Sequence, residues 1–457
     1  MKNNTQVLEQ ENIKTALWKY ALPSAAGGLI GAIYNIVDQI FIGHQIGMIG
    51  NAATNVVFPI VTLTNAIAMM AGVGASAGFG IRLGRKQHAE AGKIIGNGIS
   101  LMVLSGFIIT LVVQLFLQYV LRLCGGTPET LPLAMIYERI TGFGIIFFIV
   151  STGGSAIIRA DGKPGYSLFS ILSCAVLNIF LDALFMLGFG MGIEGSALAT
   201  LISQIFSGLI VIFYFVFKFQ SVKLKLEYFI PDFSGFFTIF KLGAGPFLNH
   251  ASMVVVQILL NNALVTWGAA SVYGSDIPLA CAGIVAKVSS ITSAIVIGIA
   301  QGAQPIISYN YGAKNYDRAR QTGLLAIKYV LIFSFGVFAC FQFIPRQITM
   351  LFGTGTEELY EFAESYFRIF MMLICVSGMQ ITVGNFFTAL GKPLISVLIS
   401  ASRQIIAFPT FLLVLPPILG LNGVLISGPL ADGICASIAG LLFMTEYRRL
   451  GRLDKEL

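Results

Sequence analysis

The chain has 457 residues, of which 56% are hydrophobic and only 11% are charged, and its mean hydropathy is +0.84. A soluble globular domain carries about 25% charged residues, so this composition excludes a soluble protein and indicates an integral membrane protein. The formal net charge of +7 does not indicate a nucleic-acid partner, because the basic residues follow a pattern of membrane topology.

Twelve apolar segments are long enough to cross a bilayer as helices, each of which needs about 20 mostly apolar residues. None of them alternates as barrel strands do, so the predicted fold class is an all-α polytopic membrane protein. The predicted spans are residues 16–43, 52–80, 94–119, 133–157, 164–189, 194–218, 235–268, 279–308, 322–344, 359–389, 394–415 and 421–446.

Lysine and arginine residues gather in every second connection between these spans. They occur before the first span, after each even-numbered span and at the end of the chain, whereas Arg122 and Arg346 are the main exceptions in the other loops. Because cytoplasmic loops carry an excess of Lys and Arg, this alternation predicts that both termini are cytoplasmic.

The two halves of the sequence repeat each other at a nearly constant offset. GRKQHAEA begins at Gly84 and GAKNYDRA at Gly312, an offset of 312 − 84 = 228, and GIEG and GLNG begin at Gly192 and Gly420, an offset of 420 − 192 = 228. Since each half has six spans, both halves have the same orientation, which predicts two six-helix lobes related by a pseudo-two-fold axis along the membrane normal. The predicted division is an amino-terminal lobe of residues 1–218, a cytoplasmic linker of residues 219–234 and a carboxy-terminal lobe of residues 235–457.

Polar residues of three different spans in the first half fall at a similar depth. Asp38 lies about five residues, or roughly 7–8 Å, below the outer end of span 1, and Asp182 and Thr200 lie at a similar level in spans 5 and 6. Asn178 shares a helix face with Asp182, one turn deeper. Two carboxylates at one level repel each other unless one is protonated or a cation lies between them, so we predict a site for H⁺ or Na⁺ at these four residues. The alternative is that each residue makes an isolated contact between helices.

Other polar residues within the spans are candidates for lining a central cavity. Lys287 either acts directly in transport or tethers a neighbouring carboxylate such as Asp432. For a single buried amide, a hydrogen bond between helices is the alternative. The cavity candidates are Tyr34, Asn35, Gln204, Gln257, Asn261, Lys287, Gln380 and Asp432.

Several motifs together resemble one family of transporters. The most specific is QGAQPIISYNYGAKNYDR, which begins at Gln301, and it occurs together with ALP at Ala21, GKP in both halves and LNIFLDALF around Asp182. Over nearly its whole length the chain resembles the multidrug and toxic compound extrusion (MATE) family, and within it the bacterial MepA-like branch.

The resemblance implies a V-shaped cavity between two lobes in the bacterial cytoplasmic membrane. It also implies export of cationic or amphipathic drugs in exchange for H⁺ or Na⁺ by alternating access. Similar proteins bind the coupling ion with an Asp, Asn, Asp and Thr cluster, and the matching motif positions here are Asp38, Asn178, Asp182 and Thr200. Other members carry an acidic residue in span 7, where this chain has only amides, so a cation site of that kind is not expected in the carboxy-terminal lobe.

Other classes of function make different demands on the sequence. A flippase for a lipid-linked precursor could share this fold, but it would need a more cationic cavity, for which Lys287 is the one indication. An enzyme is not expected because the sequence has no HExxH or CxxC motif, and an ATP-driven pump would need a GxxxxGK[ST] loop, which is also absent. We expect no cofactor besides the coupling ion, and a chain that works as a monomer.

Overall fold

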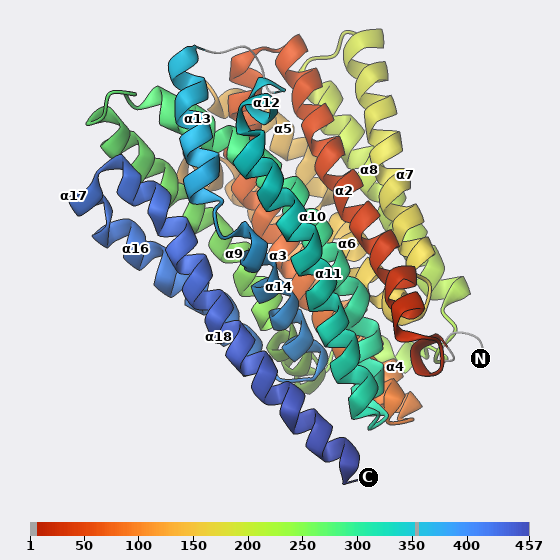
Figure 1. Ribbon diagram of the computed structural model, residues 1–457. Coiled ribbons are helices and arrows are strands. Elements are labelled where there is room, and N and C mark those ends of the chain that lie inside the picture. The colour runs from red at the N-terminus through yellow and green to blue at the C-terminus, as the bar shows by residue number, and fades with distance from the viewer. Residues whose placement is uncertain (1–6, 352–355, 457) are drawn as a thin grey trace.

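The computed structural model describes residues 7–351 and 356–456, and all regular elements in these ranges are helices (Figure 1). Eleven helices are long and apolar enough to cross a membrane, and a bent pair raises the number to twelve when it is counted as one span. The predicted fold class is therefore confirmed.

The first half of the chain folds into six spans, two of which end in π-helical turns. The helices are α2 (Ile13–Gln45), α3 (Met48–Gly84), α4 (His88–Leu123), α5 (Leu131–Thr141) with α6 (Ile145–Ala160), α7 (Pro164–Asp182) with a π-helical turn (Ala183–Gly188), and α8 (Ile193–Phe213) with a second one (Tyr214–Lys218).

The second half repeats this order with more interruptions. Its helices are α9 (Phe233–Ala269), α10 (Asp276–Gly312), α11 (Tyr316–Phe343), the short α12 (Pro345–Met350), α13 (Glu357–Phe370), α14 (Ile374–Ala389), α15 (Pro393–Ala401) with a π-helical turn (Ser402–Ala407), α16 (Phe408–Val414), α17 (Pro416–Leu419) and α18 (Leu421–Lys455). The prediction of one continuous helix over 359–389 is wrong, because α13 and α14 meet at an angle of 49°.

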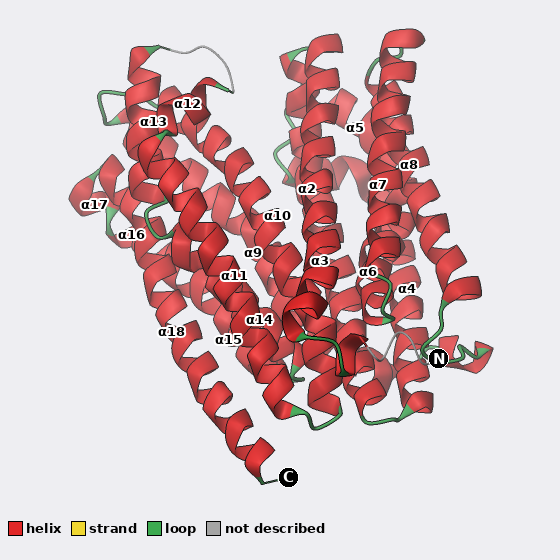
Figure 2. Ribbon diagram, turned by 45° about the vertical axis from the view of Figure 1, so that its right-hand side comes forward, coloured by secondary structure: helices red, strands yellow, loops and turns green. Residues whose placement is uncertain are grey.

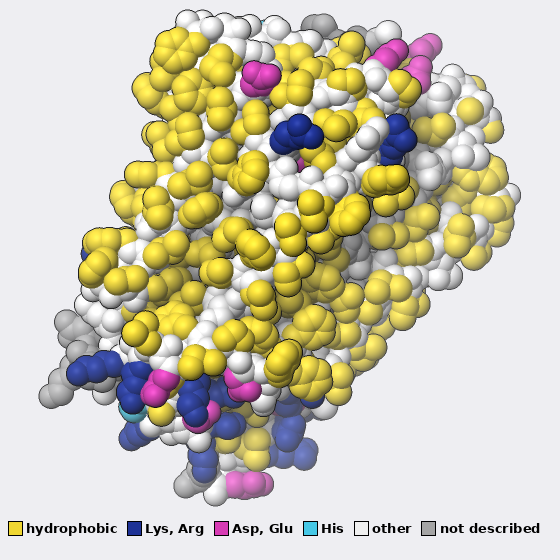
Figure 3. Space-filling model, turned by 180° about the vertical axis from the view of Figure 1, so that it is seen from behind, with side chains coloured by type: hydrophobic (Ala, Val, Ile, Leu, Met, Phe, Trp, Pro, Cys, Tyr) yellow, Lys and Arg dark blue, Asp and Glu magenta, His cyan; other side chains and the backbone are white. Residues whose placement is uncertain are grey.

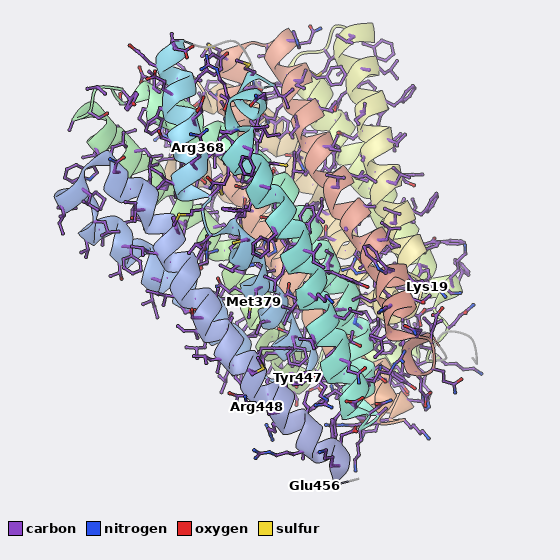
Figure 4. All side chains as sticks on the ribbon, viewed as in Figure 1. Lys19, Arg368, Met379, Tyr447, Arg448 and Glu456 are labelled. Atoms are coloured by element: carbon purple, nitrogen blue, oxygen red, sulfur yellow. The ribbon has the colours of Figure 1, made fainter. Side chains whose placement is uncertain are left out.

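The surface of the molecule has an apolar middle and a charged end. Large apolar side chains are exposed along the outer helices, such as Leu115 at 67% and Leu441 at 71%, and they suit contact with acyl chains. The start of α2 and the end of α18 lie at one face, where Arg448 and Glu456 also lie (Figures 1 and 4). We call it the terminal face. Lysine and arginine side chains gather there, and few appear at the other end (Figure 3).

The two lobes pack closely toward the terminal face and separate toward the opposite face. Helix α2 packs against α10, and α3 packs against α9. A Cβ atom added to Gly298 of α10 would meet Ala25 of α2 at 2.3 Å, whereas one added to Gly31 of α2 or Gly283 of α10, farther from the terminal face, would meet nothing within 4 Å. Figure 2 shows the two groups of helices diverging in that direction.

The segment between the lobes is held against the amino-terminal lobe by buried polar side chains. Asp161, which follows α6 and is fully buried, accepts hydrogen bonds from the backbone N–H of Ser221 at 2.9 Å and from the hydroxyl of Tyr214 at 2.5 Å. Farther along, the hydroxyl of Ser100 donates to the carbonyl of Phe229 at 2.6 Å. Burial raises the pKa of the Asp161 carboxyl, and the hydrogen bonds from Ser221 and Tyr214 oppose this rise. The domain boundaries at 218 and 235 stay a prediction.

We expect Asp161→Asn to destabilise the protein by about 1.5–3 kcal/mol, because the amide group turns an N–H donor toward other donors and weakens charge-assisted hydrogen bonds. The measurement is the midpoint of thermal unfolding in detergent. Asp232→Asn is the matched control, since the exposed Asp232 caps α9 by accepting from the N–H groups of Ser234 and Gly235, and Asn caps helices equally well. Equal midpoints for the two variants would contradict the role of Asp161.

Candidate functional site

Three neighbouring helices of the amino-terminal lobe bring the predicted carboxylates together. Helix α7 packs against both α2 and α8. Asp38 of α2 is 8% exposed, and its Oδ1 accepts a hydrogen bond of 2.7 Å from the hydroxyl of Ser196 on α8. Asp182, the last residue of α7, is fully buried, and its carboxyl group lies beside that of Asp38.

The carboxyl group of Asp182 lacks a hydrogen-bond donor. Within the described residues neither of its oxygens has a partner, and its neighbour Asp38 is itself an acceptor when ionised. Two acceptor groups placed face to face in a buried site are stable only if one carries a proton or if a cation lies between them. The arrangement therefore suits the binding and release of a monovalent cation.

The two remaining residues of the predicted site add neutral oxygens. The side-chain amide of Asn178 donates to Oγ1 of Thr200 at 3.4 Å, and its Oδ1 is buried with no partner among the residues that the structure describes. Carboxylate, amide and hydroxyl oxygens are the ligands that hard cations prefer, so this donor set fits Na⁺ as well as H⁺. The structure brings the four predicted residues together, and their part in ion coupling stays a prediction.

The backbone changes its helical form at this site. Asp182 ends the α-helical part of α7, and a π-helical turn follows directly from Ala183 to Gly188. Single π-helical turns inside longer helices are frequent at functional sites. This turn could not be predicted, because a π-helical turn has the same apolar residues as the helix before it.

Two neighbours of the site were missed by reasoning from the sequence. The phenol of Tyr137 on α5 lies beside Thr200 and close to both carboxyl groups, and Ser196 is the donor to Asp38. Ser196 lies four residues before Thr200, so a search for polar pairs on one helix face could have found it. Tyr137 could not have been found by such a search, because the other residues of the site all lie on other spans.

Another buried carboxyl group lies in the same lobe but has its own partner. Glu138 on α5 is 2% exposed and accepts a hydrogen bond of 2.9 Å from the hydroxyl of Thr141. It follows Tyr137 directly in the sequence. Because Thr141 satisfies one of its oxygens, Glu138 differs from Asp182, and it serves below as a control.

The cavity candidates of the amino-terminal lobe have different environments. Tyr34 is partly buried and lies near both Asp38 and Asp182. Asn35 is exposed, and its amide donates to the carbonyl of Gly31 on its own helix at 2.7 Å. The Oε1 atom of Gln204 is buried and has no partner within residues 7–351 and 356–456.

The carboxy-terminal candidates do not form a matching carboxylate site. Gln257 donates to Asn261 at 2.8 Å along α9, and Lys287 on α10 is exposed, with no ion pair in the described ranges. The predicted alternative that Lys287 tethers Asp432 is wrong, because Nε of Arg403 pairs with Oδ1 of Asp432. Arg403 lies in a π-helical turn within a span that reads as apolar, which explains why it was overlooked.

Eleven or twelve membrane helices in the described part of the chain form two lobes that meet at one face, and one lobe has a buried pair of carboxyl groups. These features define a two-lobed membrane transporter. The family model MatE matches residues 23–184 and again residues 251–413. The two matches begin at an offset of 251 − 23 = 228, which equals the offset of the repeated motifs. The chain belongs to the MATE family of multidrug efflux transporters.

Characterised relatives match over nearly the whole chain. The Multidrug export protein MepA of Staphylococcus haemolyticus (strain JCSC1435) is 26% identical over 450 residues, which cover 97% of this chain and 96% of the relative. MepA of Staphylococcus aureus (strain MSSA476) is also 26% identical, over 95% of this chain and 94% of the relative. The resemblance to the MepA-like branch is thereby confirmed.

Solved structures share the fold. A structure described as the outward-facing conformation of a multidrug resistance MATE family transporter has a TM-score of 0.91 at 22% identity, and the match covers 99% of both chains. A transporter from Pyrococcus furiosus, whose description reads "reverse polarity of binding pocket suggests different function", has the same TM-score, identity and coverage. At this level of identity the likeness shows the fold alone.

Proposed function

We propose that the protein exports cationic or amphipathic compounds from the bacterial cytoplasm in exchange for H⁺ or Na⁺. The observation that carries this proposal is the buried Asp182 carboxyl, which has no donor in the described part of the chain and lies beside Asp38. A site of this kind binds a cation reversibly, and the membrane potential and ion gradient supply the energy. The multidrug export named for the MepA relatives supports the choice of cargo.

The separation of the lobes supports alternating access as the mechanism. The excess of Lys and Arg in the loops on the side of the termini supports a cytoplasmic terminal face, and with this orientation the lobes of the structure are apart on the outer side. In this state a cation enters the site of Asp38 and Asp182 and draws α2 toward α7 and α8. A bound cation changes the equilibrium between two arrangements of the lobes only if it binds one more tightly, so cargo and cation must favour different arrangements.

The test is efflux of ethidium from proteoliposomes under an imposed pH gradient and, separately, under a Na⁺ gradient. We expect inward movement of one of the two ions to drive ethidium the other way, with no transport in the absence of both gradients. Ethidium transport whose rate does not depend on either gradient would contradict antiport. Movement of a lipid-linked pyrophosphate in place of ethidium would favour a flippase instead.

A further inference from the structure

A small polar pocket lies inside the carboxy-terminal lobe, away from the carboxylates described above. It has a volume of about 130 Å³ and lies among α9, α10, α14, α15 and the π-helical turn that follows α15. Asn249 and Met253 of α9 line one side. The next residue after Asn249 is His250, whose ring Nδ1 lies 3.4 Å from the amide of Asn65 on α3. The pocket therefore adjoins the boundary between the lobes, where cargo would pass.

Arg403 is the one charged residue among those that line this pocket. Its Nε donates to Asp432 of α18, which is 6% exposed and does not itself line the pocket. In residues 7–351 and 356–456 its Nη1 and Nη2 atoms make no hydrogen bond. A planar guanidinium group with free N–H donors is suited to a carboxylate, which it binds through two parallel hydrogen bonds.

The side-chain oxygens of two buried amides in the pocket wall also lack a partner in the described residues. Gln380 and Gln404 are 5% and 7% exposed, and the Oε1 atom of each is buried without a hydrogen bond in the described residues. Their amide nitrogens are already used, by the carbonyl of Ile399 at 2.9 Å and by Oδ1 of Asn249 at 3.5 Å. An unpaired amide oxygen needs a hydrogen-bond donor, so these two atoms suit water molecules in the pocket, and Arg403 alone suits an anion.

The internal repeat relates this pocket to the cation site of the amino-terminal lobe. The GKP motif begins at Gly162 and at Gly391, an offset of 391 − 162 = 229, so Arg403 shortly after it corresponds to Cys174 (403 − 229 = 174). With the offset of 228 between GIEG and GLNG, Asp432 corresponds to Gln204 (432 − 228 = 204) of the first half. Cys174 and Gln204 each lie one helical turn from a residue of the cation site, namely Asn178 and Thr200. Corresponding helices thus present carboxylates in one lobe and a guanidinium group in the other, which fits cargo that carries both signs of charge.

We propose that the carboxy-terminal pocket binds the carboxylate of amphoteric cargo, with Arg403 as the residue that contacts it. This inference rests on the proposed export function and specifies its substrate class. The pocket is large enough for a carboxylate and the atoms next to it, while the cationic remainder of the compound extends toward the space between the lobes. A purely cationic compound gains nothing from this pocket.

The test uses tetramethylrhodamine, which has a free carboxylate, and its methyl ester, which does not. Binding of each dye to the purified full-length protein is measured by fluorescence polarisation. We expect the wild-type protein to bind the acid about tenfold more tightly than the ester, the gain of a charge-assisted contact. The double variant R403Q/D432N, which leaves no unpaired buried charge, should bind both dyes equally.

Two further variants keep the test independent of folding and of the coupling site. Arg403→Lys retains a cation without the planar fork and should reduce the preference for the acid, whereas Arg122→Gln, exposed on α4, should leave it unchanged. A wild-type protein that does not distinguish the dyes, or a double variant that still does, would overturn the proposal. Because this readout is binding without a gradient, failure of antiport would be seen separately, in the ethidium experiment.

Discussion

Asp182→Asn is expected to abolish ion-driven efflux while the protein stays folded. The substituted amide can donate a hydrogen bond to Asp38, so it supplies permanently what a proton or a cation supplies reversibly in the wild-type protein. The site is then fixed in one state, and the gradient can no longer act on it. Asp38→Asn should have the same effect, because the amide faces Asp182 in the same way. Since coupling free energies correspond to about 5- to 150-fold changes in affinity, we expect gradient-driven ethidium efflux to fall at least about tenfold.

The controls for this prediction come from the same lobe. Glu138→Gln alters another buried carboxyl, but one that has Thr141 as a partner, and it should leave gradient-driven efflux intact. The thermal unfolding midpoint of each variant should stay close to that of the wild-type protein, because an amide replaces a carboxyl of the same shape. Normal coupled efflux by both aspartate variants would show that the site is not needed for ion coupling.

Gly298→Val is expected to push the lobes apart at the terminal face. The added side chain would collide with the backbone of Ala25 on α2, where even a Cβ atom has no room. Overpacking of this kind costs about 1–3 kcal/mol, which corresponds to roughly a 5- to 150-fold change in the ratio of the two arrangements of the lobes. Distances between spin labels at the ends of α2 and α10 opposite the terminal face should shorten as the protein turns toward the other arrangement.

Gly283→Val is the matched control on the same helix, because a Cβ atom there meets nothing within 4 Å. It should leave the distance distribution unchanged. A hydrogen bond across the lobes, from Nη2 of Arg159 on α6 to Oε1 of Gln301 on α10 at 2.8 Å, opposes separation at the terminal face, so Gly298→Val combined with Arg159→Gln should shift the distances further. Unchanged distances in the combined variant would refute the view that close packing of α2 and α10 holds this state.

The fold could be predicted from the sequence because few backbone structures can cross a lipid bilayer. Long apolar segments must be helices, and the distribution of Lys and Arg sets their direction. The constant offset between GRKQHAEA and GAKNYDRA identified two equivalent lobes. Counting residues from the loop ends was enough to place Asp38 and Asp182 at one depth, since a helix rises by a fixed 1.5 Å per residue.

Features that depend on contacts between helices could not be predicted in the same way. The bend between α13 and α14 has no proline or glycine within Phe370–Ile374. It occurs where α13 is tied to α11, through the hydrogen bond of 3.0 Å from the amide of Gln342 to the carbonyl of Arg368. Likewise, depth alone could not choose between Lys287 and Arg403 as the partner of Asp432, because the choice depends on how α10 and α15 face α18.

The attachment of the inter-lobe segment limits where the chain can flex. Asp161 and Ser100 bind it to the amino-terminal lobe, and Oδ1 of Asn97 accepts a hydrogen bond of 2.9 Å from the N–H of Asp232 directly before α9. These contacts fix the segment to the amino-terminal lobe up to the start of α9, so we expect any movement between the lobes to leave it in place like a strap on that lobe. An antibody fragment raised against this strap would therefore bind one lobe only and should not prevent the conformational changes of transport.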